Sequence, residues 1–309
     1  MGFSGGYGPV DDAESIATIQ AALEAGISYL DTGDFYGAGQ NEMLLREALK
    51  GRRDRAFIAV KFGALRGPDG AWLGSDNRPS AVKNFLAYTL RRLGTGYIDL
   101  YQPARVDPAV PIEDTVGAIA DMVQAGFVRH IGLSEASAAT IRRAHATHPI
   151  VALQIEYSLM SRSVERSILP ALRALGIALV AYGVLSRGLI ADHTHAGVTK
   201  PGEIRGRMPR FQGENFVKNL ALVEALKTIA IEKGCSTAQL AIAWVASRGD
   251  DVIPLIGAKR RDQLRDAIGA LDVRLSAADI ARIESAMPAD TAAGDRYGAA
   301  LMTHLDSES

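Results

Sequence analysis

Short apolar runs alternate with amphipathic stretches along almost the whole chain. The run 27–32 (ISYLDT) follows the stretch 11–26, in which Ile16, Ile19 and Leu23 recur at helical spacing behind acidic capping residues. Apolar runs without polar alternation indicate strands buried on both faces, and strands separated by helices indicate parallel crossovers. The pattern predicts strands at 27–32, 56–61, 97–102, 128–134, 150–156, 177–183 and 252–257, and helices at 11–26, 41–50, 79–93, 112–125, 138–147, 164–175, 216–248 and 260–271.

This order of elements predicts an α/β fold, namely a (β/α)8 barrel of the TIM type with one strand fewer than the full set. The first barrel strand is expected to be missing or truncated, because residues 1–9 (MGFSGGYGP) have the character of a strand's last residues and its following loop. An open doubly wound sheet is the alternative, but the first predicted strand is not followed by Gly-x-Gly-x-x-Gly. Because no linker or low-complexity tract divides the chain, we expect residues 1–309 to form a single domain.

Composition and charge narrow the range of partners. The 34 Lys and Arg residues nearly balance the 35 Asp and Glu residues, giving a net charge of -1, so no basic field would attract nucleic acid or an anionic membrane. No apolar run reaches the roughly 18 residues that span a bilayer, and the N-terminus lacks the features of a signal peptide. The single cysteine, Cys235, excludes an intrachain disulfide. We therefore expect a cytoplasmic protein that binds a small molecule.

Polar residues follow two successive predicted strands. Asp31 ends the first, Tyr36 lies in the loop DTGDFYGAGQNE after it, and Lys61 ends the second. Each has an ordinary interpretation by itself, but the carboxyl ends of barrel strands share one face, so the three side chains are expected to cluster. A lysine beside a phenol stabilises the phenolate and lowers the pKa of the tyrosine, while a carboxylate keeps the lysine charged. The pattern predicts Tyr36 as a proton donor to a carbonyl oxygen.

The segments around these residues resemble the aldo-keto reductase family over nearly the whole chain. The similarity extends from GFSGGYGPVDD through FLAYTLRRLGTGYIDLYQ, IEDTVGAIADMVQAGFVRHIGLSEAS, IEYSLMSR and PRFQGENF to AGDRY. The resemblance implies an eight-stranded barrel that reduces aldehydes and ketones with NADP(H), and it assigns catalytic roles to Asp31, Tyr36 and Lys61. The family's catalytic histidine, in a motif similar to YQxHxxD, corresponds to Ala104, which has no donor for the substrate carbonyl.

The resemblance also implies a cofactor site at the ends of later strands. Ser134 and Gln154 correspond to contacts of the nicotinamide carboxamide, although Glu135 stands where the family usually has an asparagine. Tyr182 corresponds to the aromatic residue that stacks under the nicotinamide ring. The turn after Tyr182 corresponds to the turn that contacts the pyrophosphate. Lys259 corresponds to the contact with the adenosine 2′-phosphate, which favours NADP over NAD. The expected cofactor residues are Ser134, Gln154, Tyr182, Gly183, Val184, Leu185, Ser186, Arg187, Gly188, Ile256, Gly257, Lys259, Gln263 and Asp266.

Two long loops rich in glycine and proline, 63–79 and 191–215, exceed the length of simple connections. By the resemblance, loops at these places wall the substrate and close over the cofactor. The expected substrate-binding residues are Tyr7, Trp72, Ala104 and Phe211. His193 and His195 lie two positions apart in the second loop, a pattern typical of a solvated loop, so no metal site is expected.

Two functions remain open at this point. A working reductase would act on carbonyl or related unsaturated compounds, at a rate lowered about 10²- to 10³-fold because one donor to the oxyanion is absent. The alternative is an NADPH-binding redox-sensing or regulatory protein with little turnover, since the cofactor positions match better than the catalytic ones. Arg105 could supply the missing donor, but side-chain alternation at the strand end is expected to point it away from the direction of Ala104. A hydrolase or isomerase would need carboxylate pairs or metal ligands that the strand ends do not offer.

Overall fold

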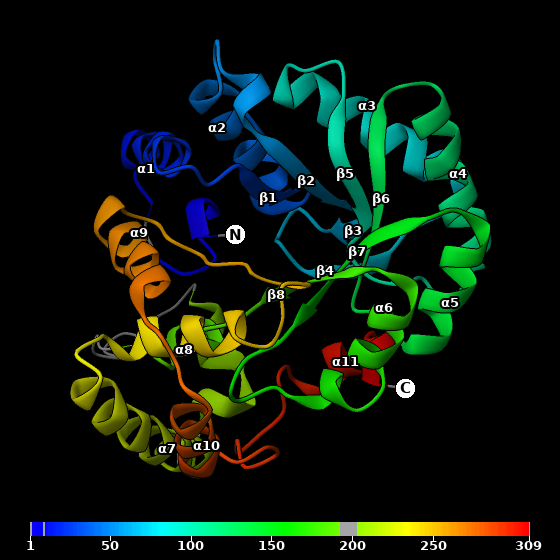
Figure 1. Ribbon diagram of the computed structural model, residues 1–309. Helices are drawn as coiled ribbons and strands as arrows, with labels where there is room; N and C mark the ends of the chain where they lie inside the picture. The colour runs from blue at the N-terminus through cyan, green and yellow to red at the C-terminus, as the bar shows by residue number, and fades with distance from the viewer. Residues whose placement is uncertain (1, 9, 192–202, 309) are drawn as a thin grey trace.

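The computed structural model describes residues 2–8, 10–191 and 203–308 of the chain. Its main sheet has seven parallel strands in the order β1-β2-β5-β6-β7-β8-β9, curled so that helices surround its outer face (Figure 1). These strands are β1 (Tyr29–Gly33), β2 (Phe57–Phe62), β5 (Ile98–Pro103), β6 (Val128–Ser134), β7 (Ile150–Glu156), β8 (Ala178–Tyr182) and β9 (Val252–Pro254). Two further strands, β3 (Ala64–Arg66) and β4 (Trp72–Ser75), form a separate antiparallel hairpin.

Helices precede the first strand of the main sheet, connect its consecutive strands and follow its last strand. They are α1 (Asp12–Glu24), α2 (Gln40–Ala48), α3 (Pro79–Leu93), α4 (Ile112–Gln124), α5 (Ala138–Thr147), α6 (Ile168–Leu175), α7 (Gly213–Glu232), α8 (Thr237–Ala246), α9 (Arg261–Ile268), α10 (Ala277–Ala286) and α11 (Ala299–Met302). Helix α1 begins where the sequence indicates, because the Asp11 carboxylate accepts from the backbone N–H groups of Ala13 and Glu14 at 2.8 and 3.1 Å.

The two faces of the sheet bury different sets of side chains. Ile58 and Val60 of β2 belong to the large core between the sheet and the helices. The intervening Ala59 points to the concave face, where it packs in a small cluster with Leu100 and Val180. Both faces are therefore apolar, which explains why the strands read as continuous hydrophobic runs.

The parallel register brings the carboxyl ends of neighbouring strands together at one edge of the curl. The paired positions are Gly33 with Lys61, Lys61 with Gln102, Ser134 with Gln154, and Glu156 with Tyr182. In barrels of this kind that edge carries the active site. We refer to it as the mouth.

The strand order confirms the predicted barrel fold with one strand fewer than the full set. The strands follow each other in chain order with no reversal, which excludes the doubly wound alternative. Among the described residues no strand lies between β9 and β1. Helix α9 packs against both α8 and α1, so the ring of helices continues across this interval (Figure 1).

Some elements differ from the expectations. The stretch 63–79, expected as a loop, contains the β3–β4 hairpin. The stretch 216–248, expected to be helical, forms the two helices α7 and α8, which are separated by a turn at Gly234 with φ 68°. The second long loop is described only in part, because residues 192–202, with both histidines, lie outside the described residues. Among the helices that are described, none combines the length and apolar character needed to cross a bilayer.

Candidate active site

A buried ion pair joins the ends of the first two strands. Lys61 Nζ lies 2.7 and 2.5 Å from the two carboxylate oxygens of Asp31 and donates to the Thr32 carbonyl at 3.0 Å. Gln154, at the end of β7, reaches the same carboxylate and donates to Asp31 Oδ1 at 2.7 Å. Two of the expected catalytic residues and one expected cofactor residue therefore meet in one cluster.

Tyr36 lies over this pair. Lys61 Nζ is 5.1 Å from the centroid of the Tyr36 ring, and the Phe35 ring packs edge-on against it at 4.8 Å. A tight turn presents the phenol, with Gly37 and Ala38 in the left-handed region at φ 59° and 51°. The sequence prediction that Asp31, Lys61 and Tyr36 cluster agrees with this geometry.

The electrostatics of Tyr36 differ from the expectation. Burial, and then the negative charge of Asp31, raise the pKa of Tyr36 well above its ordinary value, whereas the sequence pattern predicts a lowered pKa. The main reason is burial, which disfavours the charged phenolate, and the nearby carboxylate of Asp31 adds to it. Burial in turn lowers the pKa of Lys61, although Asp31 opposes this change. Tyr36 consequently retains its proton at neutral pH.

Ala104 and Arg105 lie just beyond β5. Ala104 is 2% exposed, and its backbone N–H donates to the Phe62 carbonyl at 2.8 Å. Arg105 donates from Nη1 to the Ala104 carbonyl at 2.6 Å and from Nη2 to the Tyr297 hydroxyl at 3.4 Å. Because β5 ends at Pro103, the direction of the Arg105 side chain is set by its contacts with the Ala104 carbonyl and Tyr297 rather than by strand alternation.

The C-terminal segment, residues 295–308, reaches the ends of β6 and β8. Tyr182 donates to Glu135 Oε1 at 2.6 Å, and its hydroxyl is 2.9 Å from that of Tyr297. Arg296 donates to both oxygens of Glu135 at 3.0 and 2.9 Å, and the Ser307 hydroxyl donates to the same carboxylate at 2.6 Å. Burial alone would raise the pKa of Glu135, but the Arg296 guanidinium holds it well below its usual range.

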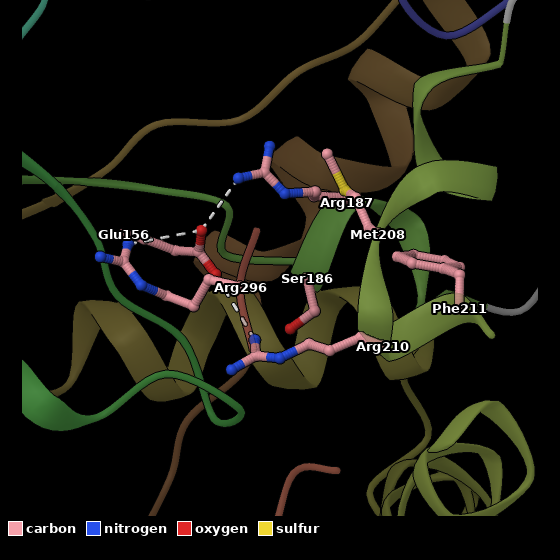
Figure 2. A pocket seen from close by; sticks show the side chains of 7 residues that line it. All are labelled: Glu156, Ser186, Arg187, Met208, Arg210, Phe211 and Arg296. Carbon is pink, nitrogen blue, oxygen red and sulfur yellow. Dashed lines mark hydrogen bonds and ion pairs between the residues drawn. The ribbon is translucent and has the colours of Figure 1, made fainter. Parts of the chain in front are cut away.

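Glu156, at the end of β7, lies among three arginines. Its carboxylate oxygens are 3.0 Å from Arg187, 3.5 Å from Arg210 and 3.6 Å from Arg296, and Figure 2 shows these side chains converging on it. The same four residues line a small cavity together with Ser186, Met208 and Phe211. Guanidinium groups outnumber carboxylates here, which favours an anionic ligand.

The turn after β8 has the backbone conformation of an anion site. Gly183, Ser186, Arg187 and Gly188 have φ values of 69°, 47°, 59° and 85°. Two successive non-glycine residues in the left-handed region are strained, and such strain is typical of ligand-binding turns, whose N–H groups form concavities for anions. The expected pyrophosphate contact, with Val184 and Leu185 inside the same turn, fits this conformation.

Lys259 lies beside the N-terminal segment. Its ammonium donates to the Tyr7 carbonyl at 2.6 Å, and its backbone N–H donates to the Gln263 side chain at 2.9 Å. Burial lowers the pKa of Lys259. Asp266 instead accepts from the Ser236 hydroxyl at 3.0 Å, so its carboxylate faces the start of α8. The residues between β9 and this lysine, Ile256 and Gly257 among them, form an irregular connection.

The aromatic residues expected to wall the substrate occupy different places. Trp72 in β4 has the Arg66 guanidinium 5.2 Å from its ring centroid and lies 6.0 Å from the ring of His304, so it joins the hairpin to the C-terminal segment. The Tyr7 hydroxyl accepts from Arg187 at 3.4 Å, beside the turn after β8. Phe211 is buried, stacks on Phe216 at 6.1 Å and lines the cavity beside Glu156.

Several residues of the mouth are absent from the predicted set. They are Arg105, Glu135, Glu156, Arg210, Arg296 and Tyr297. The sequence does indicate Glu135 and Glu156, because both stand at the ends of predicted strands. Buried carboxylates at such positions require cationic partners. Arg296 and Tyr297 belong to the segment 293–297 (AGDRY), which has no periodic apolar pattern from which a position at the mouth could be predicted.

Comparison with known proteins gives a consistent result. The pattern that defines the Aldo/keto reductase family matches residues 1–288. The chain is 44% identical over 301 residues to a probable aldo-keto reductase from Glycine max, covering 96% of this chain and 86% of that protein.

Solved structures of the same family are also similar. A glycerol dehydrogenase from Gluconobacter oxydans gives a TM-score of 0.83 at 27% identity, covering 98% of this chain and 90% of the other. The holo form of an aldo-keto reductase from Bacillus halodurans gives 0.76 at 28% identity, covering 92% and 90%. The chain therefore belongs to the aldo/keto reductase family, whose members are oxidoreductases that act on small carbonyl compounds with a nicotinamide cofactor.

Proposed function

We propose that this chain reduces aldehydes and ketones, or a related unsaturated substrate, with NADPH and with Tyr36 as the proton donor. The observation that carries the proposal is the Asp31–Lys61 pair at 2.5 and 2.7 Å with the Tyr36 ring centroid 5.1 Å from the ammonium. An ammonium fixed beside a phenol is already in place to stabilise the phenolate that proton transfer leaves behind.

The residues of the cluster divide the chemistry between them. Bound NADPH would supply the hydride that adds to the carbonyl carbon. The Tyr36 hydroxyl transfers its proton to the carbonyl oxygen, so that the C=O becomes an alcohol and Tyr36 a phenolate. Lys61 stabilises that phenolate, and Asp31 orients the ammonium until the phenol regains a proton from solvent. The raised pKa of Tyr36 suits this role because the phenol keeps its proton until a substrate accepts it.

The residues present fit an anionic dinucleotide. The left-handed turn 183–188 and the arginines around Glu156 would hold the pyrophosphate. Ser134 and Gln154 would hold the carboxamide, and Tyr182 the nicotinamide ring. Lys259 is half-buried and has no ion-pair partner within the described parts of the chain, which favours a ligand with an additional phosphate, NADP rather than NAD.

Turnover with and without the phenol tests the reductase function. The protein is incubated with NADPH and a panel of aromatic and short-chain aldehydes while the absorbance of the reduced cofactor is followed. Tyr36→Phe should lower kcat by about 10²- to 10⁴-fold with the dissociation constant for NADPH unchanged within about twofold. Tyr88→Phe, at an exposed tyrosine, is the matched control and should leave both values unchanged.

The same experiment decides between the two functions left open by the sequence. Steady turnover that depends on Tyr36 supports the reductase. Tight NADPH binding with turnover no faster than that of Tyr36→Phe would overturn the reductase and favour a sensing role.

A further inference from the structure

Arg105 differs from every other buried or half-buried arginine in the described parts of the chain. All the others form an ion pair with a carboxylate, Arg53, Arg92, Arg162, Arg187, Arg210 and Arg296 among them. Within those same parts Arg105 has only a carbonyl at 2.6 Å and a phenol at 3.4 Å as acceptors. Removing a guanidinium from water without a counter-charge is unfavourable, so a site that keeps one is prepared for an anion.

The guanidinium of Arg105 lies across the mouth. It follows β5 but contacts Tyr297, whose hydroxyl is 2.9 Å from that of Tyr182 at the end of β8. Strands β6 and β7 lie between β5 and β8 in the sheet, so the side chain spans the opening. Burial raises the pKa of Tyr36 and lowers that of Lys61, and the charge of Arg105 lowers both pKa values, which places it within electrostatic range of the two catalytic groups.

Packing, rather than an ion pair with a carboxylate of the described residues, holds Arg105 in this position, and the charge of Glu135 acts on it at longer range. Its guanidinium carbon is 5.8 Å from the centroid of the Tyr297 ring, and Arg187 lies 4.5 Å from the same centroid. Tyr297 is fixed because its neighbour Arg296 is paired with Glu135. A guanidinium has five N–H donors, and the described contacts occupy two of its nitrogens, so donors remain for a ligand.

A second positive charge stands at the rim of the mouth. The Arg66 guanidinium carbon is 5.2 Å from the Trp72 ring centroid and 6.0 Å from that of Phe35, whose ring contacts Tyr36. Of the carboxylates near Tyr36, Asp31 is already paired with Lys61. An anionic substrate that approaches Tyr36 therefore meets two guanidinium groups.

We propose that Arg105 binds a carboxylate of the substrate, so that the preferred substrates are carbonyl compounds that also carry a carboxylate. This inference rests on the proposed reductase function of the same site. The planar fork of a guanidinium matches a carboxylate with two charge-assisted hydrogen bonds. Because the carboxylate is charged before, during and after reduction, the contact should act mainly on KM and little on kcat.

Matched acids and methyl esters test the inference. The substrates are pyruvate, succinic semialdehyde and terephthalaldehydic acid, which place the carboxylate at three distances from the carbonyl, each beside its methyl ester. The native chain should prefer at least one acid over its ester by about 10- to 100-fold in kcat/KM, chiefly through KM. Arg105→Gln should remove that preference, because it should lower kcat/KM for the acid far more than for the ester. Arg105→Lys, which keeps the charge but loses the fork, should retain part of it.

Controls separate this role from a general effect of charge or folding. Arg142→Gln removes an exposed arginine of α5 and should leave the acid-to-ester ratio unchanged. An equal loss for acid and ester in Arg105→Gln would overturn the inference, because Arg105 would then act on the reacting oxygen or on the fold. Equal rates for acids and esters in the native chain would also overturn it.

A binding measurement keeps the inference distinct from the reductase function. Benzoate and benzamide are titrated calorimetrically into the protein saturated with NADPH. The carboxylate site is supported if the native chain binds benzoate but not benzamide and if Arg105→Gln no longer binds benzoate. This result supports the site even when no aldehyde is turned over, and in that case only the reductase proposal fails. Turnover of esters that depends on Tyr36, without benzoate binding or acid preference, overturns the carboxylate site alone.

Discussion

Glu135 and Arg296 form a buried ion pair with two hydrogen bonds, at 3.0 and 2.9 Å, between the end of β6 and the C-terminal segment. Arg296 also donates to Glu308 at 2.6 Å. Because Tyr297 follows Arg296 directly, the pair sets the position of the phenol that contacts both Tyr182 and Arg105. One carboxylate therefore supports a chain of contacts that runs across the mouth.

Glu135→Gln should destabilise the protein substantially. The change leaves a buried guanidinium with less counter-charge, and removing one partner of a buried pair typically costs about 3 to 5 kcal/mol. We expect a loss of about 3 kcal/mol in the free energy of unfolding, since Glu308 still contacts Arg296. Urea unfolding measures it as a lower midpoint. The control Glu113→Gln breaks an exposed pair with Arg143 and should cost less than about 1 kcal/mol, so equal losses would contradict a special role for the buried pair.

The barrel and the core of the catalytic cluster could be predicted because their signals are local. The apolar runs at 128–134 and 150–156 coincide with β6 and β7. Asp31 and Lys61 meet because both lie near the carboxyl ends of adjacent parallel strands, so the order of the strands brings them close together.

The rest of the mouth depends on contacts between distant parts of the chain. Arg105 and Tyr297 are 192 positions apart in the sequence, and Glu135 and Arg296 are 161 positions apart. No local periodic pattern can therefore predict either contact. The pKa of Tyr36 likewise depends on how deeply the phenol is buried and on its distance from Asp31, which residue types alone do not give.

Asp34 should make the free energy of unfolding depend on pH. Burial, and then the charge of Glu42, raise the pKa of Asp34 to about 7, and Asp34 Oδ2 is buried with no hydrogen-bond partner among the residues that the structure describes. The folded protein thus keeps a proton that the unfolded chain loses near pH 4, so this group lowers stability as the pH rises from about 4 to 7. Asp34→Asn should be more stable than the native chain at pH 8, by up to about 4 kcal/mol, and equal to it at pH 4.

Urea unfolding at the two pH values measures this difference. Asp76→Asn is the control of opposite sign, because hydrogen bonds from Arg78 lower the pKa of Asp76 and its removal should cost more at pH 8 than at pH 4. A pH-independent effect of Asp34→Asn would contradict this prediction, because the pKa of Asp34 would then be the same in the folded and the unfolded chain.

Lys259 should distinguish NADPH from NADH. A lysine that binds the 2′-phosphate contributes a charge-assisted contact, so Lys259→Met should raise the dissociation constant for NADPH by about 10- to 100-fold and leave that for NADH within about twofold. Calorimetric titration of both cofactors measures this, with the exposed Lys227→Met in α7 as the control. Equal weakening of both cofactors would instead indicate that Lys259 acts by holding Tyr7, to whose carbonyl it donates at 2.6 Å.

Ala104→His should raise the reduction of neutral aldehydes, for which Arg105 offers no carboxylate contact. An imidazole at this position would give the developing oxyanion a second donor beside Tyr36, worth about 10²- to 10³-fold in kcat. Because Ala104 is 2% exposed, the larger side chain should also lower the free energy of unfolding by about 1 to 3 kcal/mol. Ala104→Leu adds bulk without a donor and should show the loss of stability but no gain in kcat. If the histidine variant gains no carbonyl reduction, Ala104 does not occupy the place of the family's catalytic histidine, and the donor to the oxyanion must be sought elsewhere in the mouth.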